Sequence, residues 1–307
     1  MDTLYITHAA CRLHEMGKWH PESPHRLDAI NDRLLSSGVM DFLIEKQAVP
    51  AVDTDLLRVH APEYLSWLHE NAPVEGYVVI DPDTVMNPHT LDAARAAAGS
   101  GITAVDAIMR EGYRRAFCAI RPPGHHARRA QAMGFCFFNN IAVAVAYAME
   151  QYGLERVAIV DFDVHHGNGT EEAFANDERV LMCSFFQHPF FPGVRLDPAP
   201  SNMINIPVDP YTKGDALRQI VSDIWMPALT RHDPQFFFIS AGFDGHREDE
   251  MGQLALVESD YAWITSQIVE LANKTADGRV VSFLEGGYDL SALGRSAEAH
   301  IRALDPL

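Results

Sequence analysis

Reactive side chains crowd into one short stretch of this 307-residue sequence. The apolar residues 158–160 lead directly into Asp161, Asp163, His165 and His166. Ionised carboxylates are costly to bury unless they are paired or bind a metal. In an extended segment, residues i and i+2 point to the same side, so Asp163 and His165 can reach one ion. A carboxylate beside an imidazole suits Zn²⁺, and this stretch therefore indicates part of a zinc site.

Such a site needs a third ligand. Asp244, which closely follows the apolar run 235–240, is the best candidate. Three protein ligands would leave a fourth position open to water, and hydrolysis needs an open site of this kind. A lone Asp-x-His pair is a weak signal, because such pairs often make structural hydrogen bonds. The metal interpretation is strengthened because reactive groups follow four apolar runs and not one.

Two further groups could do proton-transfer and hydrogen-bond chemistry. His125 and His126 follow the run 116–120, and a histidine suits proton transfer near neutral pH. Tyr288 follows two glycines, which let the chain pass close to a ligand. Its hydroxyl could donate a hydrogen bond to a developing oxyanion. Structural alternatives stay open, since the histidines could cap a loop and the tyrosine could sit on an ordinary turn.

The chain around these groups predicts an α/β fold. Short runs, most of them rich in β-branched or aromatic residues, predict buried strands at 3–7, 116–120, 156–160, 179–185, 235–240 and 279–284. Between them lie segments with helical spacing or an almost entirely apolar surface, at 91–109, 139–151, 217–224 and 264–271. We expect Pro227 to end or kink the third segment and Ser259 to be the N-cap of the fourth. This alternation implies a parallel sheet with helices on both faces, whose C-terminal edge gathers the reactive residues.

The charge balance, the cysteines and the lack of long apolar runs indicate which classes of partner and compartment are expected. The net charge is −18, from 24 basic and 42 acidic residues, which disfavours nucleic-acid binding and would attract cationic substrates. The four cysteines lie far apart without a C-x-x-C pair, as is typical of small core residues in a reducing compartment. No signal-peptide pattern and no apolar run of membrane-spanning length is present. We expect one domain over residues 1–307, in the cytoplasm, without a membrane partner; a homo-oligomer stays open.

Six motifs, taken together, resemble the histone deacetylase family. Their order and spacing match over roughly residues 20–290, so the combined signal is far more specific than any single motif. They are RPPGHHA (121–127), GFCFFNN (134–140), DFDVHHGNGT (161–170), FFPG (190–193), ISAGFDGH (239–246) and EGGY (285–288). The resemblance implies the arginase-like α/β domain, with zinc at the C-terminal edge of the sheet. The class II and bacterial deacetylase-like amidohydrolase branch, more than class I, is what the chain resembles in HPESPHRL (20–27), HHGNGT (165–170) and AGFDGHREDEMGQL (241–254).

The resemblance implies a role for each reactive side chain. Zn²⁺ would be bound by Asp163, His165 and Asp244. His126 would take a proton from the attacking water and later give it to the leaving amine. His125, oriented by Asp161, would support it electrostatically, and Tyr288 would polarise the amide carbonyl together with the metal. Asn168 stands where class I members carry an aspartate, which is usual in the class II branch.

A structural K⁺ behind the zinc is also implied by the resemblance. Its ligands would be the side chains of Asp161 and Ser184 and the backbone oxygens of Asp163, His165 and Phe185. A second monovalent site would lie near Phe174 and Val180. Taken alone, Ser184 could equally be a core hydroxyl that bonds its own backbone.

An apolar channel for the substrate follows from the same match. Phe135 and Phe191 correspond to two aromatic residues that sandwich the aliphatic chain of acyl-lysine in relatives, which would make a narrow slot that excludes water. Without the resemblance both would be interpreted as core residues. Gly134, which precedes Phe135, and Gly287, which precedes Tyr288 in EGGY, are also expected to contact the substrate. Arg26 matches a buried arginine near the cavity through which acetate leaves, although it could also make a plain surface salt bridge.

Met251 discriminates between two classes of substrate. Polyamine deacetylases of this superfamily carry a glutamate seven residues after the metal-binding aspartate, where it holds a second cationic amine. Counted from Asp244, this position is Met251, and a thioether cannot pair with a cation. Acetyl-lysine in a peptide, or another neutral N-acyl chain, is therefore favoured. A loop shift of one residue would present Glu250 instead.

Our main hypothesis is a zinc-dependent amidohydrolase that removes acetyl or related acyl groups from lysine side chains or lysine-like amines. An acetylpolyamine deacetylase is the second candidate. A binuclear ureohydrolase of the same fold is less favoured, because such enzymes need bridging aspartates where this chain has His166 and Asn168. A catalytically silent module that binds acyl-lysine is a further alternative, which the intact His125, His126 and Tyr288 disfavour.

Overall fold

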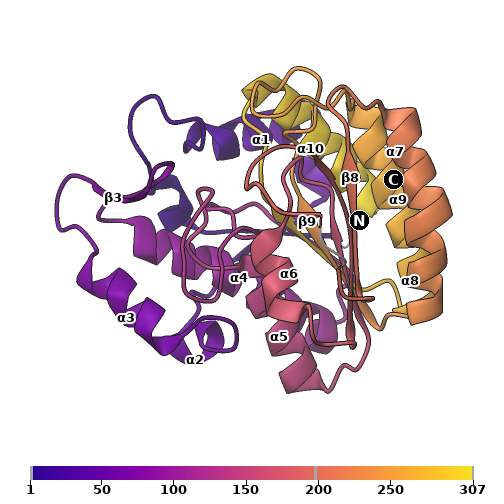
Figure 1. Cartoon of the computed structure of the whole chain (residues 1–307), viewed down its shortest axis with the longest axis horizontal. Helices are drawn as coiled ribbons and strands as arrows, with labels where there is room; N and C mark the ends of the chain where they lie inside the picture. Colours follow the sequence, from indigo (N-terminus) through magenta and orange to yellow (C-terminus); the bar gives the residue numbers. More distant parts are fainter. Residues whose placement is uncertain (1–2, 197–198, 306–307) are drawn as a thin grey trace.

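Within residues 3–196 and 199–305, which the computed structural model describes, eight parallel strands form one sheet (Figure 1). In order across the sheet they are β2 (Ile44–Gln47), β1 (Thr3–Thr7), β5 (Arg115–Cys118), β10 (Val280–Leu284), β9 (Phe236–Ala241), β6 (Val157–Asp161), β7 (Val180–Gln187) and β8 (Met203–Val208). Outside this sheet, β3 (Val78–Asp81) pairs antiparallel with β4 (Thr84–Met86).

Helices cover both faces of the sheet. On one face α4 (Thr90–Glu111) packs against α5 (Asn140–Tyr152), to the left of the sheet in Figure 1. On the other face α1 (His25–Ser36), α10 (Leu290–Leu304) and α9 (Glu258–Thr275) form a row. The remaining α-helices are α2 (Asp53–Leu56), α3 (Pro62–Glu70), α6 (Asn168–Phe174), α7 (Gly214–Ile220) and α8 (Met226–His232). The predicted α/β architecture, a parallel sheet with helices on both faces, is confirmed.

All predicted strands are present, but the sequence patterns did not indicate the two strands at the edges of the sheet. In β2, half-buried and exposed residues alternate, and its sequence IEKQ is mostly polar. At the opposite edge, β8 contains Asn205 and Pro207. A proline is tolerated on an edge strand because one side of that strand needs no ladder hydrogen bonds. Edge strands therefore lack the continuous apolar run by which the central strands were recognised.

One prediction about a helix end is wrong, and of the two outcomes predicted for Pro227 the helix end is not observed. The N-cap of α9 is Val257 and not Ser259, because the Asp260 carboxylate accepts a hydrogen bond from the Val257 N–H (3.0 Å). Pro227 does not end its helix either. A π-helical turn, Val221–Trp225, joins α7 to α8, and the proline lies in the first turn of α8. The π-helical turn just before the proline interrupts the regular α-helical hydrogen-bond pattern, which is typical of a helix kink, so the kink at Pro227 stays a prediction.

The C-terminal ends of the central strands lie together at one edge of the sheet. β5, β10, β9 and β6 are neighbours, and every residue in them is buried. Parallel pairing places Asp161, at the end of β6, beside Ser240 in β9. Because ligands bind at the C-terminal edge of such sheets, the segments after these strands are where a site is expected. The topology thus brings together four segments that are distant in sequence.

Core packing is continuous through the sheet and its helices. On β9 the Phe236 ring stacks on Phe238, with 4.7 Å between centroids, and Phe185 of β7 stacks on Trp225 at 5.3 Å. All four cysteines are buried and free, as expected of core residues. Across the described ranges, no helix combines the length and the apolar character that crossing a bilayer requires.

Candidate active site

Three side chains of metal-ligand type converge where β6 and β9 end. Asp163 and His165 follow β6, Asp244 follows β9, and their ligand atoms lie within 4.8 Å of one another. All three side chains are buried. Asp244 Oδ1 accepts a hydrogen bond from the Val164 N–H (3.0 Å), whereas its Oδ2 accepts none within the described part of the chain and lies 3.2 Å from His165 Nδ1. A buried carboxylate oxygen without a donor is costly unless a cation lies beside it.

Gly286 leaves the space that this cluster needs. Its N–H donates a hydrogen bond to Asp163 Oδ2 (2.9 Å). A Cβ atom here would lie 1.9 Å from Asp244 Oδ2 and 2.7 Å from Asp163 Oδ2, so a side chain cannot be accommodated without moving both carboxylates. Two carboxylates and one imidazole form a donor set that suits Zn²⁺, with a further position open. The residues present therefore fit a metal ion of this kind.

The charges of the cluster also favour a cation. Burial would raise the pKa of Asp163, but His125 and His165 outweigh burial and hold that pKa below its usual range. Burial and the charge of Asp163 raise the pKa of Asp244 to about 6. Burial would lower the pKa of His165, yet the neighbouring carboxylates of Asp163 and Asp244 outweigh burial and raise it to about 9. A proton on His165 and a metal cation would thus compete for the same place.

His125 is held as a cation by carboxylates. It follows β5, and its Nδ1 lies 3.0 Å from Asp161 Oδ2. Burial would lower the pKa of His125, but Asp163 and Asp161 outweigh burial and raise that pKa to about 10. At neutral pH His125 therefore carries a proton on both ring nitrogens.

His126 faces an amide in place of a carboxylate. Its Nδ1 lies 2.8 Å from Asn168 Oδ1, while Asn168 Nδ2 lies 3.5 Å from Met133 Sδ. Because an amide oxygen only accepts, His126 donates from Nδ1 and keeps a lone pair on Nε2. Burial, with His125 and His165 nearby, lowers the pKa of His126 well below its usual value. His126 is therefore neutral, with Nε2 available as a base.

Glu285 fixes the loop that carries both histidines. Its Oε2 accepts hydrogen bonds from the N–H groups of Gly124 (2.7 Å) and His125 (3.1 Å), and its Oε1 accepts one from the Ser240 hydroxyl (3.2 Å). Burial raises the pKa of Glu285 to about 7. In the sequence, Glu285 was recognised only as part of the EGGY motif. Its role in fixing the loop could not be predicted, because the two loops that it joins are distant in sequence.

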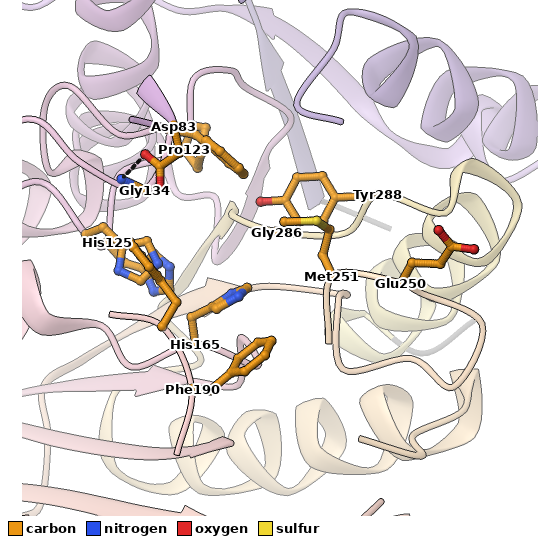
Figure 2. A pocket seen from close by; sticks show the side chains of 13 residues that line it. Asp83, Pro123, His125, Gly134, His165, Phe190, Glu250, Met251, Gly286 and Tyr288 are labelled. Carbon is orange, nitrogen blue, oxygen red and sulfur yellow. Dashed lines mark hydrogen bonds between the residues drawn. The ribbon is translucent and has the colours of Figure 1, made fainter. Parts of the chain in front are cut away.

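A cavity of about 250 Å³ opens beside the metal-ligand cluster (Figure 2). It is lined by Asp83, Pro123, His125, His126, Gly134, Phe135, His165, Phe190, Phe191, Glu250, Met251, Gly286 and Tyr288. The predicted substrate residues on this lining are Gly134, Phe135, Phe191 and Met251. Arg26 and Gly287 are not on it. The predicted proton-transfer pair, the predicted tyrosine and one metal ligand therefore border one cavity.

Aromatic rings form much of the wall. The Phe191 ring meets His126 edge-on, with 5.1 Å between centroids, and Phe135 meets Tyr288 edge-on at 5.8 Å. Phe190 stacks on the imidazole of the metal-ligand cluster at 5.2 Å. The FFPG motif was recognised in the sequence, but only Phe191 was predicted to line the channel, and Phe190 was not. Walls of this kind accept a methylene chain and exclude water.

Arg26 supports Tyr288 from behind the cavity wall. Its guanidinium lies 4.8 Å from the tyrosine ring centroid and donates to the backbone oxygens of Gly287 (2.6 Å) and Glu285 (2.5 Å). It also pairs with Glu22, with 3.0 Å between Nη1 and Oε1. Because Arg26 and Glu22 are both fully buried, this is not a surface salt bridge. The arginine holds the backbone around the tyrosine and does not line the cavity.

Asp83 is a lining residue that sequence reasoning missed. It lies in the turn between β3 and β4. Its Oδ1 accepts hydrogen bonds from the Gly134 N–H (3.2 Å) and the Thr84 hydroxyl (2.8 Å). The Asp-Pro dipeptide at 81–82 marks a turn, but the turn signal does not say that this hairpin reaches the cavity.

The predicted K⁺ ligands have partners within the protein. Ser184 Oγ donates to Asn205 Oδ1 (2.7 Å), so it does not bond its own backbone. Asp161 Oδ1 accepts a hydrogen bond from the Asp163 N–H (3.1 Å). Phe185 is buried next to Ser184 on β7. The potassium site stays a prediction.

An amide occupies the place expected for a second monovalent cation. The Nδ2 atom of Asn202 lies within hydrogen-bond distance of the backbone oxygens of Phe174 (2.9 Å), Asp177 (3.0 Å) and Val180 (3.0 Å). An amide nitrogen carries two hydrogens, so three carbonyl oxygens share them. A cation at this position would have to displace the Asn202 amide.

Comparisons with known proteins agree with this geometry. The histone deacetylase domain matches residues 20–304. A probable deacetylase of Archaeoglobus fulgidus is 37% identical over 298 residues, which cover 94% of this chain and 82% of that protein. The human polyamine deacetylase HDAC10 is 34% identical over 301 residues, which cover 92% of this chain and 44% of that protein. The crystal structure of the HDA15 HD domain matches with a TM-score of 0.92 and 32% identity, over 98% of this chain and 87% of that one. The chain therefore belongs to the histone deacetylase family of metal-dependent deacetylases.

Proposed function

We propose that this protein is a zinc-dependent amidohydrolase that removes acetyl or related acyl groups from lysine side chains or lysine-like amines. One observation carries the proposal: a neutral histidine, His126, and a buried set of metal ligands meet at one apolar cavity. A base beside an open metal site is the arrangement that amide hydrolysis by water requires. We also propose that residues 1–307 form one catalytic domain.

His126 moves the proton in this mechanism. Zn²⁺ held by Asp163, His165 and Asp244 would supply Lewis acidity, which lowers the pKa of water and polarises a carbonyl. His126 Nε2 accepts a proton from the attacking water, because Nδ1 is committed to Asn168. The same nitrogen then gives the proton to the leaving amine nitrogen as the C–N bond breaks. The products are a carboxylate and the protonated amine, because the second proton of the water also passes to the amine nitrogen.

Two further groups act on charge and orientation. The His125 cation, whose ring centroid lies 4.0 Å from that of His126, keeps the neighbouring ring neutral until water gives up its proton. The Tyr288 hydroxyl lies on the side of its ring that faces the histidines (Figure 2), where it can donate to the substrate oxygen as negative charge develops. Phe135 and Phe191 exclude water and hold the aliphatic chain.

Acetyl-lysine in a peptide is the substrate class that we favour. Met251 lines the cavity, and its thioether gives no charge with which to hold a distal cationic amine. An acetylpolyamine is the second candidate, because the exposed Glu250 also borders the cavity and the human polyamine deacetylase is 34% identical to this chain. A silent binding module is disfavoured, since His125, His126 and Tyr288 all border the cavity.

The test is the kcat/KM of the zinc-loaded protein on an acetyl-lysine peptide and on N-acetylspermidine. We expect turnover of both to depend on the metal and the peptide to be preferred. Preference for the polyamine would keep the chemistry and overturn the substrate class. Binding of the peptide without turnover would favour the silent module, and activity on neither substrate would contradict the proposed function.

A structural K⁺ is part of the same proposal. Asp161, Ser184 and the backbone oxygen of Phe185 lie next to one another on paired strands β6 and β7, where Asp161 pairs with Ser184. Replacing K⁺ by Na⁺ in the buffer should lower the thermal midpoint of unfolding, because a bound ion stabilises the folded state. An unchanged midpoint would argue against this ion.

A further inference from the structure

Asp249 is a buried carboxylate in the segment between the metal ligand Asp244 and Met251. Its exposed fraction is 5%. Its Oδ1 accepts a hydrogen bond from the Met251 N–H (2.9 Å). Its Oδ2 accepts hydrogen bonds from the N–H groups of Tyr288 (2.6 Å) and Asp289 (2.9 Å). One carboxylate thus joins the segment that follows β9 to the segment that follows β10.

The two segments meet at the cavity. Met251 and Tyr288 both line it, and Figure 2 shows them on one side, with His165 and Phe190 on the other. All three hydrogen-bond donors to Asp249 are backbone N–H groups, so the carboxylate holds main chain and not flexible side chains. Hydrogen bonds to an ionised acceptor are roughly twice as strong as those between neutral groups.

We propose that Asp249 is a positioning residue that sets Tyr288 and Met251 together on one wall of the cavity. The inference rests on the proposed function, in which the tyrosine hydroxyl acts on the substrate carbonyl. Arg26 and Phe135 contact the ring of the tyrosine, whereas Asp249 holds its backbone, so the place of the hydroxyl depends on both sets of contacts. A displacement of about 1 Å is enough to lose on the order of 100-fold in rate.

Asp249 needs both of its carboxylate oxygens to hold the two segments, because each oxygen accepts hydrogen bonds from a different segment. An asparagine offers one accepting oxygen and one donating nitrogen. Asp249→Asn must therefore lose either the bond from Met251 or the pair from Tyr288 and Asp289. It also turns an amide N–H toward a backbone N–H. Asp249→Ala loses all three bonds, so the two variants should form a graded series.

Asp260 offers a matched control. Its exposed fraction is also 5%, and its carboxylate accepts hydrogen bonds from the Val257 N–H (3.0 Å) at the start of α9 and from Arg218 Nε (2.9 Å) of α7. It is not among the residues that line the cavity. Asp260→Asn thus disturbs an equally buried capping carboxylate without touching the segment that carries the tyrosine.

Double-mutant kinetics separate a positioning role from general destabilisation. The measured quantity is kcat of the zinc-loaded protein on an acetyl-lysine peptide. Asp249→Asn should lower kcat on the order of 10–100-fold, and Asp260→Asn by less than about twofold. In a Tyr288→Phe background, Asp249→Asn should have no further effect on kcat, because the hydroxyl that it positions is gone. An equal loss in both backgrounds would overturn the inference.

Hydrogen exchange of backbone amides gives a readout that does not depend on activity. Asp249→Ala should remove the protection of the Met251 amide and of the Tyr288 and Asp289 amides together, while α9 stays protected. Asp260→Asn should affect only the start of α9 and the neighbouring α7, to which Asp260 is joined through Arg218. Protection that persists at Met251 and Tyr288 would overturn the inference. A wild-type protein without deacetylase activity would refute the proposed function instead, and the exchange result would still decide the role of Asp249.

Discussion

The acceptor beside His126 sets the pH range in which that histidine can act as a base, and Asn168→Asp tests this directly. His125 and His126 differ in the group that lies within hydrogen-bond distance of Nδ1. His125 Nδ1 lies 3.0 Å from the Asp161 carboxylate, and His126 Nδ1 lies 2.8 Å from the Asn168 amide oxygen. The pKa of His125 is raised to about 10, whereas that of His126 is held well below its usual value.

The size of the effect follows from that comparison. Two carboxylates, Asp163 and Asp161, act on His125, and Asn168→Asp would add one carboxylate at His126. A single opposite charge in contact raises a histidine pKa by about 1–3, and a change of one in pKa is worth about 1.4 kcal/mol. The base form of His126 is lost as the pH falls through its pKa. The acid limb of the pH profile should therefore move to a pH that is higher by about 1–3.

The assay is kcat/KM on an acetyl-lysine peptide from about pH 5 to about pH 9, with zinc content measured in parallel. At a pH below both acid limbs, the variant should lose roughly tenfold in kcat/KM for every increase of one in the pKa of His126. Asn71→Asp, which adds the same charge at the end of α3, controls for net charge and should leave the limb in place. An acid limb that stays in place or moves downward in Asn168→Asp, at unchanged zinc content, would refute His126 as the base.

Three further substitutions test other parts of the site. Gly286→Ala would place a methyl group 1.9 Å from Asp244 Oδ2, so the zinc stoichiometry measured by atomic absorption should fall, and full zinc content would contradict the packing argument. Tyr288→Phe removes one donor to the developing oxyanion and should lower kcat about 10²–10³-fold at unchanged zinc content, whereas an unchanged kcat would remove the tyrosine from the mechanism. Met251→Glu puts a carboxylate on the cavity lining and should shift the ratio of kcat/KM values from an acetyl-lysine peptide toward N-acetylspermidine. An unchanged ratio would show that position 251 does not face a distal amine.

The metal-ligand cluster could be predicted from the sequence because its residues stand at strand ends. Asp163 and His165 follow one buried apolar run and Asp244 follows another, and neighbouring parallel strands bring such ends together. The parallel pairing of β6 with β9 brings the two strand ends that carry these ligands next to each other. The central strands are short but continuously apolar, and these runs predicted the fold as well.

The residues that support the site were harder to predict. Asp249 and Glu285 are acidic residues that a sequence alone places on the surface, since charged side chains are mostly exposed. Each is buried because loops distant in sequence supply backbone N–H donors to it. The expectation that Arg26 lies near an exit cavity stays a prediction, and sequence patterns gave no sign that it packs against the Tyr288 ring and holds the backbone there. Contacts of this kind depend on loop geometry, for which periodicity carries no signal.

The edge strands were not predicted, and the N-cap of α9 was predicted wrongly, for a related reason. β2 and β8 have one side without a neighbouring strand in the sheet, so their polar residues are tolerated and their apolar signal is weak. Ser259 is a good N-cap residue by type, but the Asp260 carboxylate satisfies the first turn of α9 from inside the helix. Local propensity was therefore overruled by a neighbouring side chain.

The central claim, that Asp163, His165 and Asp244 hold one metal ion on which amide hydrolysis depends, is tested most directly by metal titration. The protein is stripped with a chelator, and zinc binding and hydrolysis of an acetyl-lysine peptide are then followed as Zn²⁺ is added. We predict that activity is absent in the stripped protein, returns in full at one equivalent, and does not return in Asp244→Asn. Full activity of the stripped protein, or undiminished zinc binding and activity in Asp244→Asn, would contradict the claim.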